Sequence, residues 1–103
     1  MLVTQGNMNH YFFGFGRSLY EYNNGNVSSI FRETDKIVWL YEDIDSALWV
    51  GKMSEGVRYY PNIRKGNYSY VKFLEGLTVS SVINDSQGNY CLTTTKEGVF
   101  MFN

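Results

Sequence analysis

The stretch YEDIDSALWVGKMSEGVRYY, residues 41–60, recurs later in the chain in a related form. The second form is INDSQGNYCLTTTKEGVFMF, residues 83–102, and it follows at a constant separation of 42 positions without a gap. A fixed period of this size is the sequence signature of a repeat architecture. Four identical pairs and two pairs of apolar residues carry the match: Asp43 and Asp85, Glu55 and Glu97, Gly56 and Gly98, Val57 and Val99, Ile37 and Val79, and Val50 and Leu92.

A third, weaker copy precedes the other two, in YFFGFGRSLYEYNNGNVSSI, residues 11–30. Residues 12–14 align with residues 49–51, and residues 19–20 align with residues 57–58. The turn between the two aligned segments is one residue shorter in this upstream copy. We therefore interpret most of the chain as repetitions of one structural unit.

Each unit has the chemistry of β-strands. KIVWLYED, residues 36–43, is rich in β-branched and aromatic residues, is too short for a stable helix and is apolar on both faces. Such a strand must be covered on both sides, as in a sheet that lies between two other sheets. ALWVGK (residues 47–52) and GVRYYPN (residues 56–62) predict two further strands, joined by a turn in which Gly56 supplies a positive φ. SYVKFL (residues 69–74) alternates apolar and polar residues and predicts an outer, half-solvated strand.

Four strands per repeat predict an all-β fold, and specifically the blade of a β-propeller. The chain has 103 residues and therefore room for about two and a half four-stranded antiparallel blades. We expect an incomplete blade at residues 1–35, a complete blade at 36–77 and an incomplete blade at 78–103, whose outer strand is missing. The alternative is an antiparallel sandwich with coincidentally similar hairpins, although the inner strands of a two-layer sandwich would alternate simply.

A partial propeller leaves apolar blade faces and strand edges uncovered, and uncovered edges recruit other chains. We therefore expect the polypeptide to self-associate or to bind the remaining blades of a longer protein.

Composition excludes several classes of function. With 44% hydrophobic and 17% aromatic residues, the chain has enough apolar material for a packed core. A formal charge of -1 without a basic block argues against nucleic-acid binding. One cysteine excludes an internal disulfide, and one histidine excludes a site with several His ligands in one copy, so no metal ligand and no cofactor is predicted. The sequence has no secretory signal and no run near the roughly 20 apolar residues that span a bilayer, so we expect no membrane insertion by this segment.

The copies that contain residues 41–60 and 83–102 resemble the two-component regulator propeller repeat, whose pattern is roughly V-x-S-I-x-x-D-x-x-G-N-L-W-I-G-T-x-x-G-L-Y-x-Y. The chain departs from it where Ser46 replaces a turn glycine, Lys52 takes a threonine position and Cys91 takes the tryptophan position. The residues that match are Asp43, Leu48, Trp49, Val50, Gly51, Gly56, Val57 and Tyr59 in one copy, and Val79, Ser81, Val82, Asp85, Gly88, Asn89, Thr94, Gly98, Val99 and Phe100 in the next.

The resemblance implies a non-enzymatic segment of a sensor in a bacterial hybrid two-component system, with an oligosaccharide fragment as its ligand. It also implies an extracytoplasmic, periplasmic location in a parent protein that carries a transmembrane helix, a histidine kinase and a DNA-binding regulator. Two alternatives remain: a protein-interaction scaffold built from the same blades, and, least favoured, a hydrolase or lyase of propeller form.

Among the polar residues, Asp43, Asp45 and Asp85 suggest either acid-base chemistry or an oxygen-ligand calcium site. However, Asp43 and Asp85 occupy equivalent positions before a turn, where aspartate commonly accepts hydrogen bonds from the turn's own amides. Cys91 and His10 suggest a nucleophile with its base, but the repeat places Cys91 at a tryptophan position, as a buried core residue. We therefore predict no catalytic residue. The residues predicted to be structural in the repeat are Asp43, Trp49, Gly51, Gly56, Asp85, Gly88 and Gly98.

The aromatic residues have two interpretations. Flat rings stack on sugar faces, and rings in turns, such as Tyr68 or Tyr90, are the candidates for such contacts. Rings also fill the space between propeller blades, which predicts a packing role for Trp39, Trp49, Tyr59 and Phe102. The sequence assigns no residue to ligand binding.

Overall fold

The structure is a computed structural model, and it describes residues 2–4, 10–32, 35–43, 45–85 and 87–102. Within these ranges the chain forms eleven strands, one 3-10 turn and no α-helix, so the predicted all-β class is confirmed. The elements are β1 (Leu2–Val3), β2 (His10–Phe15), β3 (Ser18–Asn23), β4 (Asn26–Arg32), β5 (Ile37–Glu42), β6 (Leu48–Lys52), β7 (Val57–Tyr60), η1 (Ile63–Lys65), β8 (Val71–Phe73), β9 (Val79–Asn84), β10 (Tyr90–Thr94) and β11 (Val99–Phe102).

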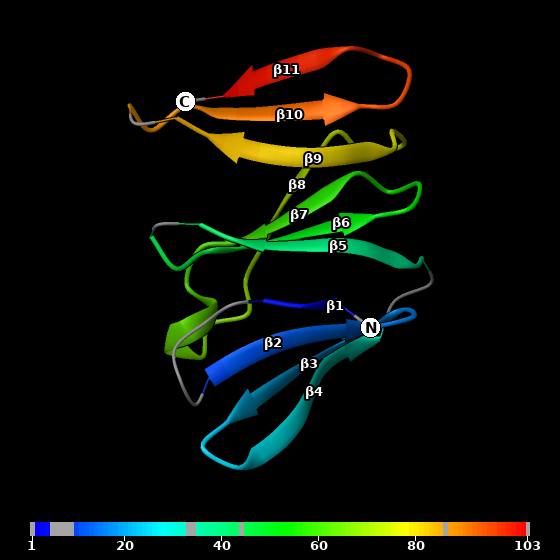
Figure 1. Ribbon diagram of the computed structural model, residues 1–103. Coiled ribbons are helices and arrows are strands. Elements are labelled where there is room, and N and C mark those ends of the chain that lie inside the picture. Colours follow the sequence, from blue (N-terminus) through cyan, green and yellow to red (C-terminus); the bar gives the residue numbers. More distant parts are fainter. Residues whose placement is uncertain (1, 5–9, 33–34, 44, 86, 103) are drawn as a thin grey trace.

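The strands form three antiparallel sheets. The N-terminal sheet has the order β1-β2-β3-β4, the central sheet β5-β6-β7-β8, and the C-terminal sheet β9-β10-β11. Figure 1 shows the three sheets stacked face to face, with the central sheet between the other two. The short strand β8 lies at the edge of the central sheet and is largely exposed, as the alternating segment SYVKFL predicts.

The repeat of 42 residues is visible in the strand pairing. Trp49 pairs with Tyr41 on one side and Tyr59 on the other. At the equivalent position of the C-terminal sheet, Cys91 pairs with Ile83 and Met101. All other pairs between β5, β6 and β7 recur in the same way between β9, β10 and β11.

Even an irregularity is repeated. The pairing between β5 and β6 skips Val38, and the pairing between β9 and β10 skips Ser80, which lies 42 positions later. The upstream copy keeps the central register too, because Phe12 pairs with Glu21 and Gly14 with Leu19, as its alignment with residues 49–51 requires. The sequence repeat is therefore a structural repeat.

The central sheet lies between two other sheets, as the sequence predicts, but β6 is buried throughout whereas β5, formed by the segment predicted to be covered on both sides, is mostly half-buried. Every residue of β6 is buried. Val50 and Leu48 belong to a core shared with the N-terminal sheet, whereas Trp49 belongs to a second core shared with the C-terminal sheet. The first core contains Phe12, Leu19, Ile37, Leu48, Val50, Tyr60 and Ile63, and the second contains Trp49, Val57, Val79, Val82 and Leu92.

The four rings predicted to pack between sheets do so. Trp49 is buried in the second core, and Trp39, Tyr59 and Phe102 pack against that core. The Trp39 indole nitrogen also donates to the carbonyl oxygen of Val79 at 2.7 Å and so ties the central sheet to the C-terminal one.

Cys91 departs from the prediction of a buried core residue, because it is only half-buried. Its neighbours on the same face of the C-terminal sheet, Ile83 and Met101, are 60% and 62% exposed. The equivalent face of the central sheet is covered by the C-terminal sheet, whereas no described residue covers this one. Cys91 therefore occupies the position equivalent to that of Trp49, but no sheet of described residues packs against it.

The turn between β5 and β6 contains a strained residue where its copy has a glycine. Ser46 has φ 63°, in the left-handed region that disfavours side chains, and the equivalent Gly88 has φ 84°. Because Ser46 is exposed, its side chain gains no packing that offsets the strain.

We predict that Ser46→Gly raises the free energy of unfolding by about 1 kcal/mol, because glycine removes the strain of the left-handed conformation. The matched reverse change, Gly88→Ser, should lower the free energy of unfolding by a similar amount. Urea denaturation followed by tryptophan fluorescence measures both. Shifts of the same sign in the two variants would contradict this account of the turn.

Candidate functional site

Asp43 has all of its accepting positions used by the chain itself. One carboxylate oxygen, Oδ1, accepts from the backbone amides of Asp45 and Ala47 at 2.9 and 3.0 Å. The other, Oδ2, accepts from the Trp49 indole nitrogen and the Tyr90 hydroxyl, both at 3.0 Å. The side chain is 5% exposed. Asp43 therefore holds the turn and links the central sheet to the C-terminal sheet, as predicted for a structural aspartate.

Asp85 accepts hydrogen bonds from the amides of its own turn, as Asp43 does, but lacks the hydrogen bonds from aromatic side chains. Its Oδ1 accepts from the amides of Gln87 and Asn89 at 2.8 and 3.0 Å. Hydrogen bonds from the side chain and the backbone of Asn89 hold the pKa of Asp85 below its ordinary value. The residue is exposed, so the same local motif exists here without the ring donors that Asp43 binds. Asp45, the third candidate acid, is also exposed.

The glycines predicted to be structural disfavour a side chain for different reasons. Gly51 lies under the Trp39 ring, and a Cβ atom there would come within 2.1 Å of that ring. Gly56 has φ 69°, as predicted, and a Cβ atom would meet the carbonyl oxygen of Phe73 at 2.2 Å. Gly98 repeats the turn of Gly56 with φ 86°, and Gly88 repeats that of Ser46.

Cys91 and His10 do not meet. Cys91 lies in β10 of the C-terminal sheet and His10 in β2 of the N-terminal sheet, with the central sheet between them. Tyr90, a candidate for ligand contact, instead packs on Trp49 with ring centroids 4.8 Å apart. Burial and the neighbouring Asp43 carboxylate raise the pKa of Tyr90, so its hydroxyl stays protonated and donates to Asp43.

His10 belongs to a buried polar cluster between the N-terminal and central sheets. Its Nε2 atom contacts a carboxylate oxygen of Glu21, whose other oxygen accepts from the Tyr68 hydroxyl at 2.8 Å. Arg64 of η1 binds both carboxylate oxygens of Glu42 and donates to the carbonyl oxygen of His10 at 3.1 Å. The side chains of His10, Glu21, Glu42 and Arg64 are between 9% and 15% exposed.

The interaction patterns of this cluster favour a structural role. The hydrogen bond to Glu42 raises the pKa of Arg64, and the hydrogen bond to Glu21 raises the pKa of Tyr68, so both groups keep their protons. The Arg64 guanidinium also lies 5.3 Å from the centre of the Phe12 ring. The cluster thus fastens η1 and the segment after it onto the two sheets. Sequence reasoning missed it because its members come from separate elements and form no spaced motif.

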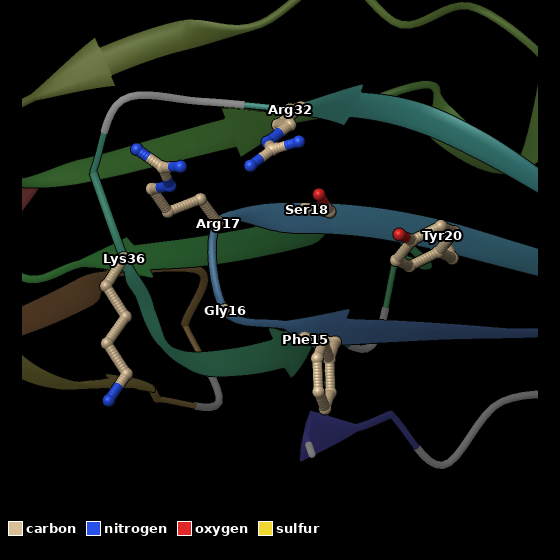
Figure 2. A pocket seen from close by; sticks show the side chains of 7 residues that line it. All are labelled: Phe15, Gly16, Arg17, Ser18, Tyr20, Arg32 and Lys36. Atoms are coloured by element: carbon tan, nitrogen blue, oxygen red, sulfur yellow. The ribbon is translucent and has the colours of Figure 1, made fainter.

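A pocket of about 510 Å³ opens near the turn between β2 and β3. Figure 2 shows Arg17 and Arg32 near the start of β3, and Lys36 on the segment that leads into β5. The rings of Phe15 and Tyr20 also contribute to the lining. The described residues that line it are Phe15, Gly16, Arg17, Ser18, Tyr20, Arg32 and Lys36, and none of these described residues is acidic.

This pocket could not be predicted from the sequence, because Arg17, Arg32 and Lys36 lie apart along the chain. Arg32 lies beside Ser18 and Phe15 because these three residues are neighbours across three strands. Lys36 joins them because the backbone amide of Ile37 donates to the carbonyl oxygen of Gly16 at 2.8 Å.

Comparisons with known proteins add no family. No family model matches the chain, and no match was found among curated proteins or among solved structures. Within the described ranges, no helix is long and apolar enough to cross a membrane.

We predict that Asp43→Asn lowers the free energy of unfolding by about 2 kcal/mol, because an amide nitrogen would then face the buried indole and hydroxyl donors. Asp85→Asn is the matched control, and it should cost clearly less because its site is exposed. Urea denaturation of the two variants beside the unchanged chain provides the comparison. Equal losses would show that the contacts with Trp49 and Tyr90 contribute nothing.

Proposed function

We propose that this chain is a segment of a β-propeller, with the three sheets as successive blades. The observation that supports it most strongly is the shared strand register of the central and C-terminal sheets at a separation of 42 residues. Sheets that are copies of one unit and pack face to face are the elements from which propellers are built.

The contacts between sheets support a radial arrangement. The N-terminal sheet meets the central sheet through contacts of β1 and β2 with β5, and the central sheet meets the C-terminal sheet through contacts of β5 and β6 with β9. These are the first two strands of the N-terminal and central sheets and the first strand of the C-terminal sheet. Blades of a propeller likewise converge on their first strands around the central channel.

We further propose that the segment recognises a ligand without catalysis, within the extracytoplasmic sensor of a two-component system. The resemblance of its repeats to the two-component regulator propeller repeat supports the sensor assignment. The engagement of Asp43, Glu21 and His10 by the chain's own groups supports binding over catalysis.

The exposed face of the C-terminal sheet supports association with a further blade or with a second copy of this chain. Ile83, Val99 and Met101 are 60% to 62% exposed there. Their equivalents 42 positions earlier are Tyr41, Val57 and Tyr59, which belong to the second core or pack against it. A further blade, or a second copy of this chain, would cover the face in the same way.

We predict that the isolated chain self-associates through this face. Met101→Lys should lower the association constant at least tenfold, because a charge would be buried in the apolar contact. Val71→Lys is the matched control, since Val71 is 50% exposed at the edge of the central sheet. Sedimentation velocity measures both variants, and a chain that is folded and monomeric at high concentration would contradict the propeller proposal.

The absence of catalysis is tested separately. We expect neutral and acidic oligosaccharides to emerge intact from long incubation with the chain, while at least one of them raises its melting temperature. Thermal denaturation reports binding and a reducing-end assay reports cleavage. New reducing ends that depend on Asp43 or Asp85, in folded variants, would replace the sensor proposal with the hydrolase alternative.

A further inference from the structure

We infer that two copies of this chain assemble head to tail into a closed ring, in which the outer face of each C-terminal sheet packs on the outer face of the other chain's N-terminal sheet. This rests on the proposed propeller and deepens it, because it names the partner surface and the number of copies. It can fail while the propeller proposal stands, since two C-terminal sheets could instead pack on each other.

Each sheet has one face that points toward the sheet that follows it along the chain, here called the forward face. On the N-terminal sheet this face carries Leu19, which is buried in the first core, and on the central sheet it carries Val57, which is buried in the second core. The strand pairing places Val99 of the C-terminal sheet at the equivalent position. Val99 is 61% exposed, so the forward face of the C-terminal sheet is open among the described residues.

The opposite face of each sheet, here called the backward face, points toward the sheet that precedes it. Val50 of the central sheet and Leu92 of the C-terminal sheet lie on this face and are buried in the first and second cores. Their equivalent in the N-terminal sheet, Phe13, is only half-buried. Val3, which pairs with Phe13, is 53% exposed, whereas Val82, which pairs with Leu92, is buried. The backward face of the N-terminal sheet is therefore open as well, as far as the described residues show.

The two open faces are of the kinds that already fit each other within the chain. Both of its contacts between sheets join a forward face to a backward face. The C-terminal sheet has a forward face to offer, and the N-terminal sheet has a backward face. A second copy can therefore extend the same packing from one chain to the next, and no new kind of contact is required.

A polar contact supports the same pairing of faces. Tyr90, on the backward face of the C-terminal sheet, donates to the Asp43 carboxylate of the central sheet at 3.0 Å. The equivalent of Asp43 on the C-terminal sheet is Asp85, which is exposed, and the equivalent of Tyr90 on the N-terminal sheet is Tyr11. Head-to-tail packing brings the Tyr11 hydroxyl group of one chain to the Asp85 carboxylate of the other. The charge-assisted hydrogen bond that joins two sheets within the chain would thus recur between chains.

The number of sheets favours a ring of two copies. Propellers close with about four to eight blades. Each chain contributes three sheets, so two copies contribute twice three, or six, whereas three copies would exceed that range. A head-to-tail contact that closes on itself leaves no forward or backward face open, unlike a contact that continues into a filament.

Disulfide trapping tests which faces meet. The rings of Trp49 and Tyr90 lie 4.8 Å apart, and the equivalents of these two residues across the inferred contact are Cys91 and Tyr11. In Tyr11→Cys, we expect oxidation with diamide to give a covalent dimer that a reducing agent separates. A link within one chain is excluded, because the central sheet lies between β2 and β10. Val71→Cys is the matched control, since Val71 is 50% exposed at the edge of the central sheet, and it should give no covalent dimer.

The unchanged chain, oxidised in the same way, should also stay free of covalent dimers, because its Cys91 faces the N-terminal sheet of the other copy. A dimer linked from Cys91 to Cys91 would overturn the inference but leave the propeller proposal standing, since two forward faces would then meet. Covalent trimers and larger species in Tyr11→Cys would overturn the closed ring of two. The absence of any covalent species, in a variant that circular dichroism shows to be folded, would overturn the head-to-tail contact.

Sedimentation velocity tests the hydrogen bond between chains. Tyr11→Phe should lower the association constant at least tenfold, because it removes a hydrogen bond to a carboxylate at both contacts of the ring. Tyr22→Phe is the matched control: Tyr22 lies beside Tyr11 on the same face, and its equivalent in the C-terminal sheet, Phe102, has no hydroxyl group. Equal association constants for the two variants would overturn the head-to-tail contact. A folded monomer at high concentration would overturn it together with the propeller proposal.

Discussion

The burial of β6 on both faces is the constraint on which the rest of the structure depends. A strand with Leu48 and Val50 on one side and Trp49 on the other cannot lie on the surface of a two-layer protein. Burying these side chains contributes roughly 1.5–3 kcal/mol for each large apolar residue. The N-terminal and C-terminal sheets bury the two faces of this strand. Each of these sheets in turn has an outer face that points away from the central sheet.

Polar contacts add specificity to this apolar stacking. Two adjacent sheets could slide past each other if only methyl groups and rings met between them. The Asp43 carboxylate accepts a hydrogen bond from the Tyr90 hydroxyl, and the Tyr41 hydroxyl donates to the side-chain oxygen of Asn84 at 2.6 Å. The Trp39 indole nitrogen donates to the carbonyl oxygen of Val79. Because buried donors are costly to leave unpaired, these bonds select one relative position of the central and C-terminal sheets.

The sequence predicted the elements whose information is local or periodic. The strands, the two apolar faces of residues 36–43 and the turn role of Asp43 follow from residues that are close together or 42 positions apart. Its errors and omissions concern contacts between distant segments. The exposure of Cys91 depends on a cover that the repeat alone cannot supply, and the clustering of His10 with Arg64 depends on how η1 folds back onto the sheets. The basic pocket likewise forms only when Arg32 is placed beside Phe15 across the N-terminal sheet.

The Trp39 ring over Gly51 has a consequence for how such a chain can diverge. In the C-terminal sheet the same two places are held by Ser81 and Thr93, whose hydroxyl groups lie 2.7 Å apart. A large ring opposite a hydrogen atom in one sheet thus corresponds to two small hydroxyl side chains in the other. A lone change at either place would leave a collision or a void, so these two sites should have changed together, and related chains should show their sizes to be inversely correlated.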